Sequence, residues 1–140
     1  MIVALHALIG AALGRFTRTR TQAALLGGVS HIAADMLPHR DLDIPQEAAL
    51  LAGTLTFIAA ARGTGSREFA GALGAAAPDI ENLIGRIRGL PDDKLLLPSH
   101  RSYHGPKTDG FHGQLALALI GLALLLLPDN LGDGGAHPPA

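Results

Sequence analysis

The sequence predicts an all-α protein, folded as an up-and-down bundle of about five helices. Hydrophobic residues make up 48% of the 140-residue chain and charged residues only 16%. Leu and Ala, which favour helices, supply most of the apolar content. The apolar residues fall into five stretches without Asp, Glu, Lys or Arg. Strand signals are weak, because β-branched runs and strict alternation of apolar and polar residues are rare.

Residues that start or stop helices separate the five stretches. Pro38 ends the second helix, and Pro45 lies at the start of the third. The turn Gly63–Ser66 divides the third helix from the fourth. A long polar connection, Gly89–Pro106, precedes the fifth helix, which stops at Pro128. The expected helices therefore cover residues 2–15, 20–37, 45–62, 66–86 and 112–127.

The helices are expected to form a single domain over residues 1–131, followed by a disordered Gly/Pro-rich tail at 132–140. Only Gly110–Pro128, with 19 residues, approaches the roughly 20 apolar residues of a membrane span. Arginines gather in turns at one end of the expected bundle and most acids at the other, which fits the positive-inside rule. We expect a bundle embedded in or bound to the cell membrane. The alternative is a soluble, cytoplasmic bundle rich in Ala and Leu.

Charge and cysteine content exclude several classes of protein. Lys and Arg number 11 and Asp and Glu 12, a net charge of -1, so a nucleic-acid partner is not expected. The absence of Cys excludes disulfides, thiolate metal sites and a cysteine nucleophile. Seven His are unusual in a chain this poor in charge. Any metal ion must therefore be bound by imidazole and carboxylate groups.

The most informative motif begins near the end of the second helix. His31 and Asp35 are four residues apart, so they share one helix face and can bind one ion. His39, Asp41 and Asp43 follow a proline, on a loop that can approach the same ion from another side. Each residue alone fits a capping, core or solvent-exposed role. As a set, they predict a site for zinc, iron or manganese.

Two further motifs carry ionisable groups. The carboxylates Asp79 and Glu81 follow a proline within the fourth helix, where a bend can turn Asp79 inward. His100 and His104 have helical i,i+4 spacing, and the guanidinium of Arg101 beside them suits a phosphate or another anion. The alternatives are a solvated helix end and a solvated basic loop.

Helix order places these motifs together. In an up-and-down bundle, odd helices start at the end where even helices finish. We therefore predict one metal centre with the ligands His31, Asp35, His39, Asp79, His100 and His104. Residues expected to orient these ligands or to line the pocket are His6, Asp43 and His112. Asp41 or Glu81 is the expected general base, and Arg101 is expected to hold the substrate anion.

The motifs resemble those of inner-membrane-associated metal-dependent hydrolases of the LexA-binding type. The matching elements are His6, the step Pro78-Asp79-Ile80-Glu81, and the loop His100-Arg101-Ser102-Tyr103-His104. The segment Ser30–His39 is more similar to the related zinc-dependent phospholipase C-like proteins. The resemblance implies one or two divalent ions, above all zinc, and hydrolysis of a phosphoester or a lipid.

Three functions fit these patterns. The leading hypothesis is a metal-dependent hydrolase acting on a small phosphoester or lipid-like substrate, in which the ion lowers the pKa of a bound water toward about 7. The second is a non-catalytic helical membrane or interaction protein, in which a structural ion clamps the loop 89–106 to the bundle. The third is a transporter-like or assembly subunit with His6 and His31 as functional polar groups within the membrane.

Overall fold

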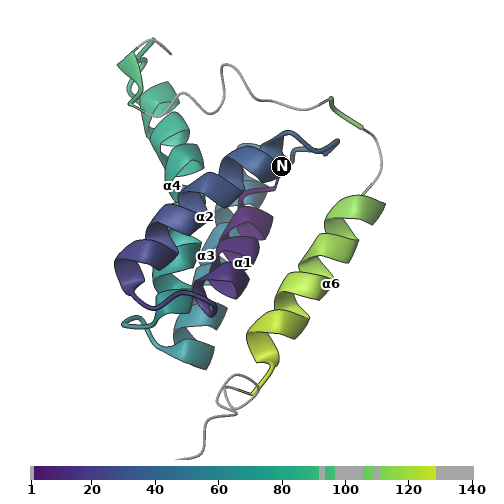
Figure 1. Cartoon of the computed structure of the whole chain (residues 1–140). Coiled ribbons are helices and arrows are strands. Elements are labelled where there is room, and N and C mark those ends of the chain that lie inside the picture. Colours follow the sequence, from purple (N-terminus) through teal and green to yellow (C-terminus); the bar gives the residue numbers. More distant parts are fainter. Residues whose placement is uncertain (1, 92–93, 97–105, 109–110, 129–140) are drawn as a thin grey trace, which may run out of the picture.

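The computed structural model describes residues 2–91, 94–96, 106–108 and 111–128, and in them the chain is all-helical. Its helices are α1 (Val3–Gly14), α2 (Arg20–Asp35), α3 (Ile44–Arg62), α4 (Arg67–Ile87) and α6 (His112–Leu126) (Figure 1). The all-α prediction is confirmed, and each helix boundary lies within two residues of the expected one. The tail 132–140 and most of the connection 89–106 lie outside the described residues.

The sequence explains where several helices begin and end. Thr19 and Gln22 form a capping box at the start of α2, in which each side chain accepts a hydrogen bond from the other residue's backbone N–H. Pro45 lies in the first turn of α3, where its missing N–H costs no helical hydrogen bond. Gly63 ends α3 with a φ of 84°, a backbone conformation that favours glycine.

Helices α1, α2 and α4 form the centre of the bundle, and their backbones touch. A Cβ atom added to Gly71 of α4 would lie 2.2 Å from the carbonyl oxygen of Gly10 in α1. A Cβ atom on Gly27 of α2 would lie 2.2 Å from the carbonyl oxygen of Gly71. We call Gly10, Gly27 and Gly71 the close-packing glycines. Only glycine permits such close contact between helix backbones.

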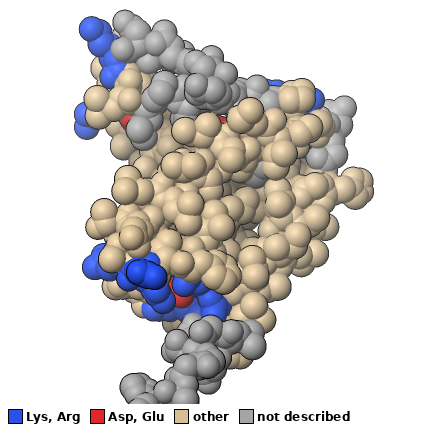
Figure 2. Space-filling view, in the orientation of Figure 1, with Lys and Arg blue, Asp and Glu red and all other residues tan. Residues whose placement is uncertain are grey.

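Helices α3 and α6 flank α1 and leave much of their apolar surface exposed. The buried core is small and rich in alanine, with Ile58 and Leu125 as its largest apolar side chains. Phe57 of α3 and Leu119 of α6 are 40% and 59% exposed. In the view of Figure 2, charged side chains lie toward the two ends of the molecule, and the flank between them is almost free of charge.

The arginine turns have a structural role at the end of the molecule where α1, α3 and α6 finish. Arg15 donates hydrogen bonds to the carbonyl oxygens of Leu124 and Leu127, at 2.7 and 2.6 Å. Arg62 donates from Nε to the carbonyl oxygen of Leu125 at 3.1 Å. Both arginines thus cap the last turn of α6, where unsatisfied carbonyls attract positive charge. The shared end shows that these three helices run in the same direction.

Among the described helices, α3 has both the length and the composition needed to cross a membrane. It contains 19 residues with a mean hydropathy of 1.3 in its most apolar window, and only 6% of that window is buried in the protein. The shorter helices α1 and α6 are also apolar. Residues 110–128 form the apolar stretch that comes nearest to spanning length in the sequence, but α6 covers only 15 of them.

Candidate metal centre

A cluster of four ionisable side chains lies between α1, α2 and α4. His6 comes from α1, His31 and Asp35 from α2, and Asp79 from α4. Each lies four or eight residues from the close-packing glycine of its own helix, and therefore on nearly the same helix face. The face that brings the backbones together thus continues into the residues that form the cluster. The order of helix directions expected from the sequence brings these residues to one end of the bundle.

Asp35 connects the two histidines. Its Oδ1 lies 2.9 Å from Nε2 of His6, and its Oδ2 lies 3.3 Å from Nε2 of His31. The two imidazole ring centroids are 4.2 Å apart. The side chains of all three residues are fully buried. Because the carboxylate accepts the hydrogen bond, Nε2 of His6 carries the proton, and the lone pair of neutral His6 lies on Nδ1.

On its other side, His31 contacts α4. Its Nδ1 donates a hydrogen bond to the carbonyl oxygen of Ala75 at 3.0 Å and lies 3.6 Å from Oδ2 of Asp79. Pro78, directly before Asp79, lies inside α4 and removes one backbone donor from the helix. The side chain of Asp79 is 9% exposed, which makes it the least buried member of the cluster.

The donor set of the cluster suits a divalent ion. His6, His31 and Asp79 each offer one ligand atom, and these atoms lie within 4.8 Å of one another. A tetrahedral ion with bonds near 2.1 Å holds its donors about 3.4 Å apart, so small side-chain shifts would suffice. Nδ1 of His6 is buried and has no hydrogen-bond partner among the described residues. Such an atom is a ready ligand, because burying it without a partner costs free energy.

Burial and neighbouring groups set the protonation of the cluster. Burial lowers the pKa of His6 below its ordinary value, against the opposing effect of the hydrogen bond to Asp35. Burial would raise the pKa of Asp35, but the His31 and His6 imidazoles outweigh it and hold that pKa well below its usual range. The cluster therefore favours a neutral His6 imidazole and an ionised Asp35, the forms in which these groups bind cations.

Glu47 supports the cluster from α3, and the sequence analysis assigned it no role. Its carboxylate accepts hydrogen bonds from the backbone N–H groups of Val3 at 2.8 Å and Leu42 at 3.0 Å. Helix α1 has no side-chain cap of its own, so Glu47 supplies one from another helix. Val3 lies one turn before His6. The available sequence signal was a lone acid in the first turn of a helix that has no further charge before Arg62, at the end where the motifs gather.

His39 takes part in a separate set of contacts. It is buried, its Nδ1 donates to the carbonyl oxygen of Leu37 at 2.7 Å, and its Nε2 lies 3.3 Å from Oδ1 of Asp41. Lys107 reaches the other oxygen of Asp41 at 3.2 Å. Burial favours the neutral form of Asp41, but the Lys107 ammonium is among the groups that outweigh it and lower its pKa. The backbone N–H of His39 donates to the carbonyl oxygen of Pro106, and its carbonyl oxygen accepts from the N–H of Thr108, so these two segments are joined.

The remaining predicted site residues have various positions. Glu81 accepts a hydrogen bond from the backbone N–H of Leu96. Asp43 is exposed directly before α3, and His112 is exposed at the start of α6. Three predicted residues, His100, Arg101 and His104, lie outside the described residues. Among the described residues, the group close enough to share an ion contains two of the predicted ligands, His31 and Asp79, together with His6.

No family model matches the chain, and no curated protein or solved structure matches it either. The resemblance to metal-dependent hydrolases of the LexA-binding type therefore stays a prediction. The function must be argued from the chemistry of the cluster formed by His6, His31, Asp35 and Asp79.

Proposed function

We propose that this protein is a metal-dependent hydrolase that acts on a phosphoester or lipid-like substrate, with His6, His31 and Asp79 binding a divalent ion, above all zinc. One observation carries the proposal: three donor residues from three different regions of the chain converge within 4.8 Å in a buried site. Imidazole and carboxylate together are the ligands of many zinc enzymes. We propose one or two ions at this site.

The charges of the cluster favour a metal ion over a simple hydrogen-bond network. Asp35 and Asp79 bring two carboxyl groups into a site that is almost closed to solvent. Isolated buried charges are unfavourable unless an opposite charge compensates them. A divalent cation with two neutral imidazoles gives a net charge of zero. Burial lowers the pKa of His6 and so favours the neutral imidazole that binds a cation.

Within this proposal, each residue has its own task. Asp35 accepts a hydrogen bond from the Nε2–H of His6 and so directs Nδ1 toward the ion, the usual role of a carboxylate behind a ligating histidine. Asp79 lies on the least buried side, where a substrate would approach. When bound, the metal supplies an acidified water and polarises the scissile group. Glu81 and Asp41 stay the candidate general bases, and Arg101 the candidate anion-binding group.

The burial of the cluster also supports the second candidate function, a non-catalytic protein with a structural ion. His6, His31, Asp35 and Asp79 offer four donor groups, and three of them are fully buried. Four protein ligands fill a tetrahedral zinc ion, as in structural sites, whereas a catalytic ion keeps one position open. If Asp35 is a ligand, as the sequence analysis predicted, the site is closed. If Asp35 only orients His6, one position stays open.

Metal analysis of the full-length protein tests both candidates. We expect about one zinc per chain after purification with zinc, and a strong loss in His6→Ala and in Asp79→Ala. His112→Ala, an exposed histidine at the start of α6, is the matched control and should keep its metal. A wild-type protein that binds no divalent ion and gains no stability from one would refute the metal centre.

Activity separates the two candidates once metal is bound. The zinc-loaded protein should hydrolyse a chromogenic phosphodiester or a phospholipid, and Asp79→Asn should abolish this activity. A metal-loaded protein that is inactive on phosphomonoesters, phosphodiesters and phospholipids would favour the structural ion.

A further inference from the structure

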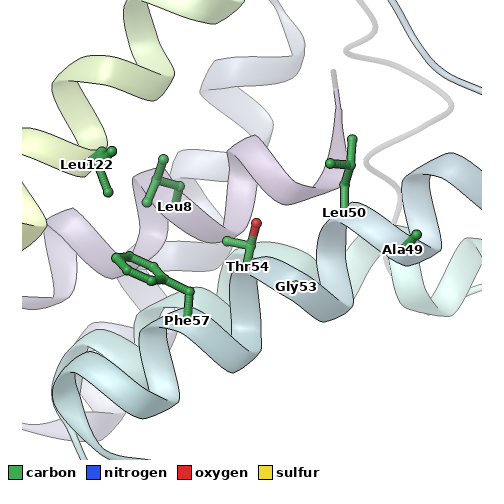
Figure 3. Close-up of a pocket in the computed structure, with 7 residues that line it drawn as sticks. All are labelled: Leu8, Ala49, Leu50, Gly53, Thr54, Phe57 and Leu122. Carbon is green, nitrogen blue, oxygen red and sulfur yellow. The ribbon is translucent and has the colours of Figure 1, made fainter.

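A groove opens on the side of α1 that faces α3 and α6. Leu8 of α1, Leu122 of α6 and the α3 residues Leu50, Gly53 and Phe57 are among its lining residues (Figure 3). The groove has a volume of about 300 Å³, at the lower end of the range for ligand-binding clefts, roughly 300–1,000 Å³. The metal cluster lies in a different seam, between α1, α2 and α4.

The lining of the groove is apolar and carries no charge. Thr54 is the single polar side chain among its lining residues. Leu50 and Phe57 are 47% and 40% exposed, so apolar surface remains open to the surroundings. At Gly53, an added Cβ would meet no atom within 4 Å, so the helix presents bare backbone to the groove. Exposed apolar surface of this kind typically marks a binding site.

The distribution of charge favours an uncharged, apolar ligand. No charged residue occurs in α3 between Glu47 and Arg62, and the groove lies along this uncharged part. The same helix has the length and composition of a membrane span and is barely buried in the protein. Arg15 and Arg62 mark one end of the uncharged flank. An unbranched hydrocarbon chain matches a groove that offers neither charges nor, apart from Thr54, hydrogen-bonding side chains.

We propose that the α1/α3/α6 groove binds one acyl chain of a membrane phospholipid. In this proposal the acyl chain lies along α3 between Leu50 and Phe57, against Leu8 and Leu122. It fills the space beside Gly53. The proposal does not depend on the metal centre, because the two sites lie on different sides of α1. Chelating the metal should leave lipid binding unchanged.

A single tryptophan can report on the groove, because the natural chain contains none. Phe57→Trp places the fluorophore in the groove, and Leu50→Trp is a second reporter in case the first disturbs it. Ile120→Trp, at an exposed position two residues before Leu122 and so on another side of α6, is the matched control. The detergent-solubilised full-length protein is titrated with phosphatidylcholine brominated on its acyl chains, which quenches tryptophan on contact.

We expect quenching of the groove reporters to saturate at low lipid fractions, whereas quenching of the control rises only in proportion to lipid. Adding Gly53→Leu, which fills the groove without meeting other atoms at its Cβ, should remove the saturable part. Ala52→Leu, at an exposed position of α3 about 100° around the helix from Gly53, should preserve it.

Three results would overturn the proposal. The first is quenching of the groove reporters that rises only in proportion to lipid, as at the control position, or saturable quenching that survives Gly53→Leu. The second is saturation by brominated stearic acid but not by the phospholipid, which would identify a free fatty acid as the ligand. The third is a dimer that Gly53→Leu dissociates without any effect on lipid, which would show that a second copy covers the groove.

Discussion

Replacing Gly71 with alanine tests whether the metal centre depends on the backbone contact between α1 and α4. The added Cβ would lie 2.2 Å from the carbonyl oxygen of Gly10. Carbon and oxygen atoms that touch without strain are about 3.3 Å apart or more. The two helices must therefore separate by about 1 Å, because both atoms belong to or adjoin backbone and cannot turn aside.

A separation of this size matters more to the metal centre than to the fold. His6 lies four residues from Gly10 in α1, and Asp79 eight residues from Gly71 in α4, so the clash separates two ligands. Metal–ligand bonds tolerate deviations of only about 0.2 Å. We expect metal affinity to fall by about tenfold or more. Overpacking should lower the free energy of unfolding by about 1–3 kcal/mol, and the better helix propensity of alanine should raise it by about 1 kcal/mol.

The matched control is Gly53→Ala in α3. Its added Cβ meets no atom within 4 Å, so the substitution should keep the metal and raise the free energy of unfolding by up to about 1 kcal/mol. Metal content and chemical denaturation, measured on both variants, give the comparison. Wild-type metal affinity and unchanged stability in Gly71→Ala would refute the reasoning that the backbone contact positions the ligands.

Three further predictions concern protonation and helix ends. In metal-free protein, the unfolded chain binds more protons than the folded one near pH 6.5, because burial lowers the pKa of His6. The free energy of unfolding should therefore fall as the pH drops from 7.5 to 5. Denaturant titrations should show that His6→Gln flattens this dependence. Glu47→Gln should lower the free energy of unfolding by about 1–3 kcal/mol, because it weakens the charge-assisted hydrogen bonds from the backbone N–H groups of Val3 and Leu42. The control Gln46→Glu, at an exposed neighbouring position, should lower it much less. Arg62→Met should speed hydrogen exchange at the last turn of α6 and leave α2 unchanged, since it removes a cap from the carbonyl of Leu125.

The helices were predictable from the sequence because their boundaries are local. Pro45 and the turn at Gly63 act within a few residues of where they stand, and α3 begins and ends beside them. The order of helix directions follows from the number of helices alone, and it brings His6, His31 and Asp79 to the same end. Both kinds of inference need no knowledge of which helices touch.

The pairing of helices was not predictable in the same way. Neighbours in an up-and-down bundle usually follow one another along the chain, yet α4 packs on α1 and α2 through Gly71. Every expected helix contains at least one glycine, and only the register between helices shows which of them are in contact. The role of Glu47 was not predicted for the same reason, because its partner Val3 belongs to another helix, 44 residues away in the sequence.

The roles of His6 and Asp35 depend on a hydrogen bond that spacing cannot reveal. The i,i+4 relation with His31 suggested that Asp35 is a ligand, and the solitary position of His6 in the first helix suggested a supporting role. The contact of 2.9 Å between His6 Nε2 and Asp35 Oδ1 favours the reverse, because a carboxylate that holds this proton frees Nδ1 for the ion. Asp35→Asn separates the two assignments. An orienting Asp35 predicts weakened but measurable metal binding, since the asparagine oxygen can still accept the hydrogen bond from His6, whereas a ligating Asp35 predicts a loss as severe as that of Asp79→Asn.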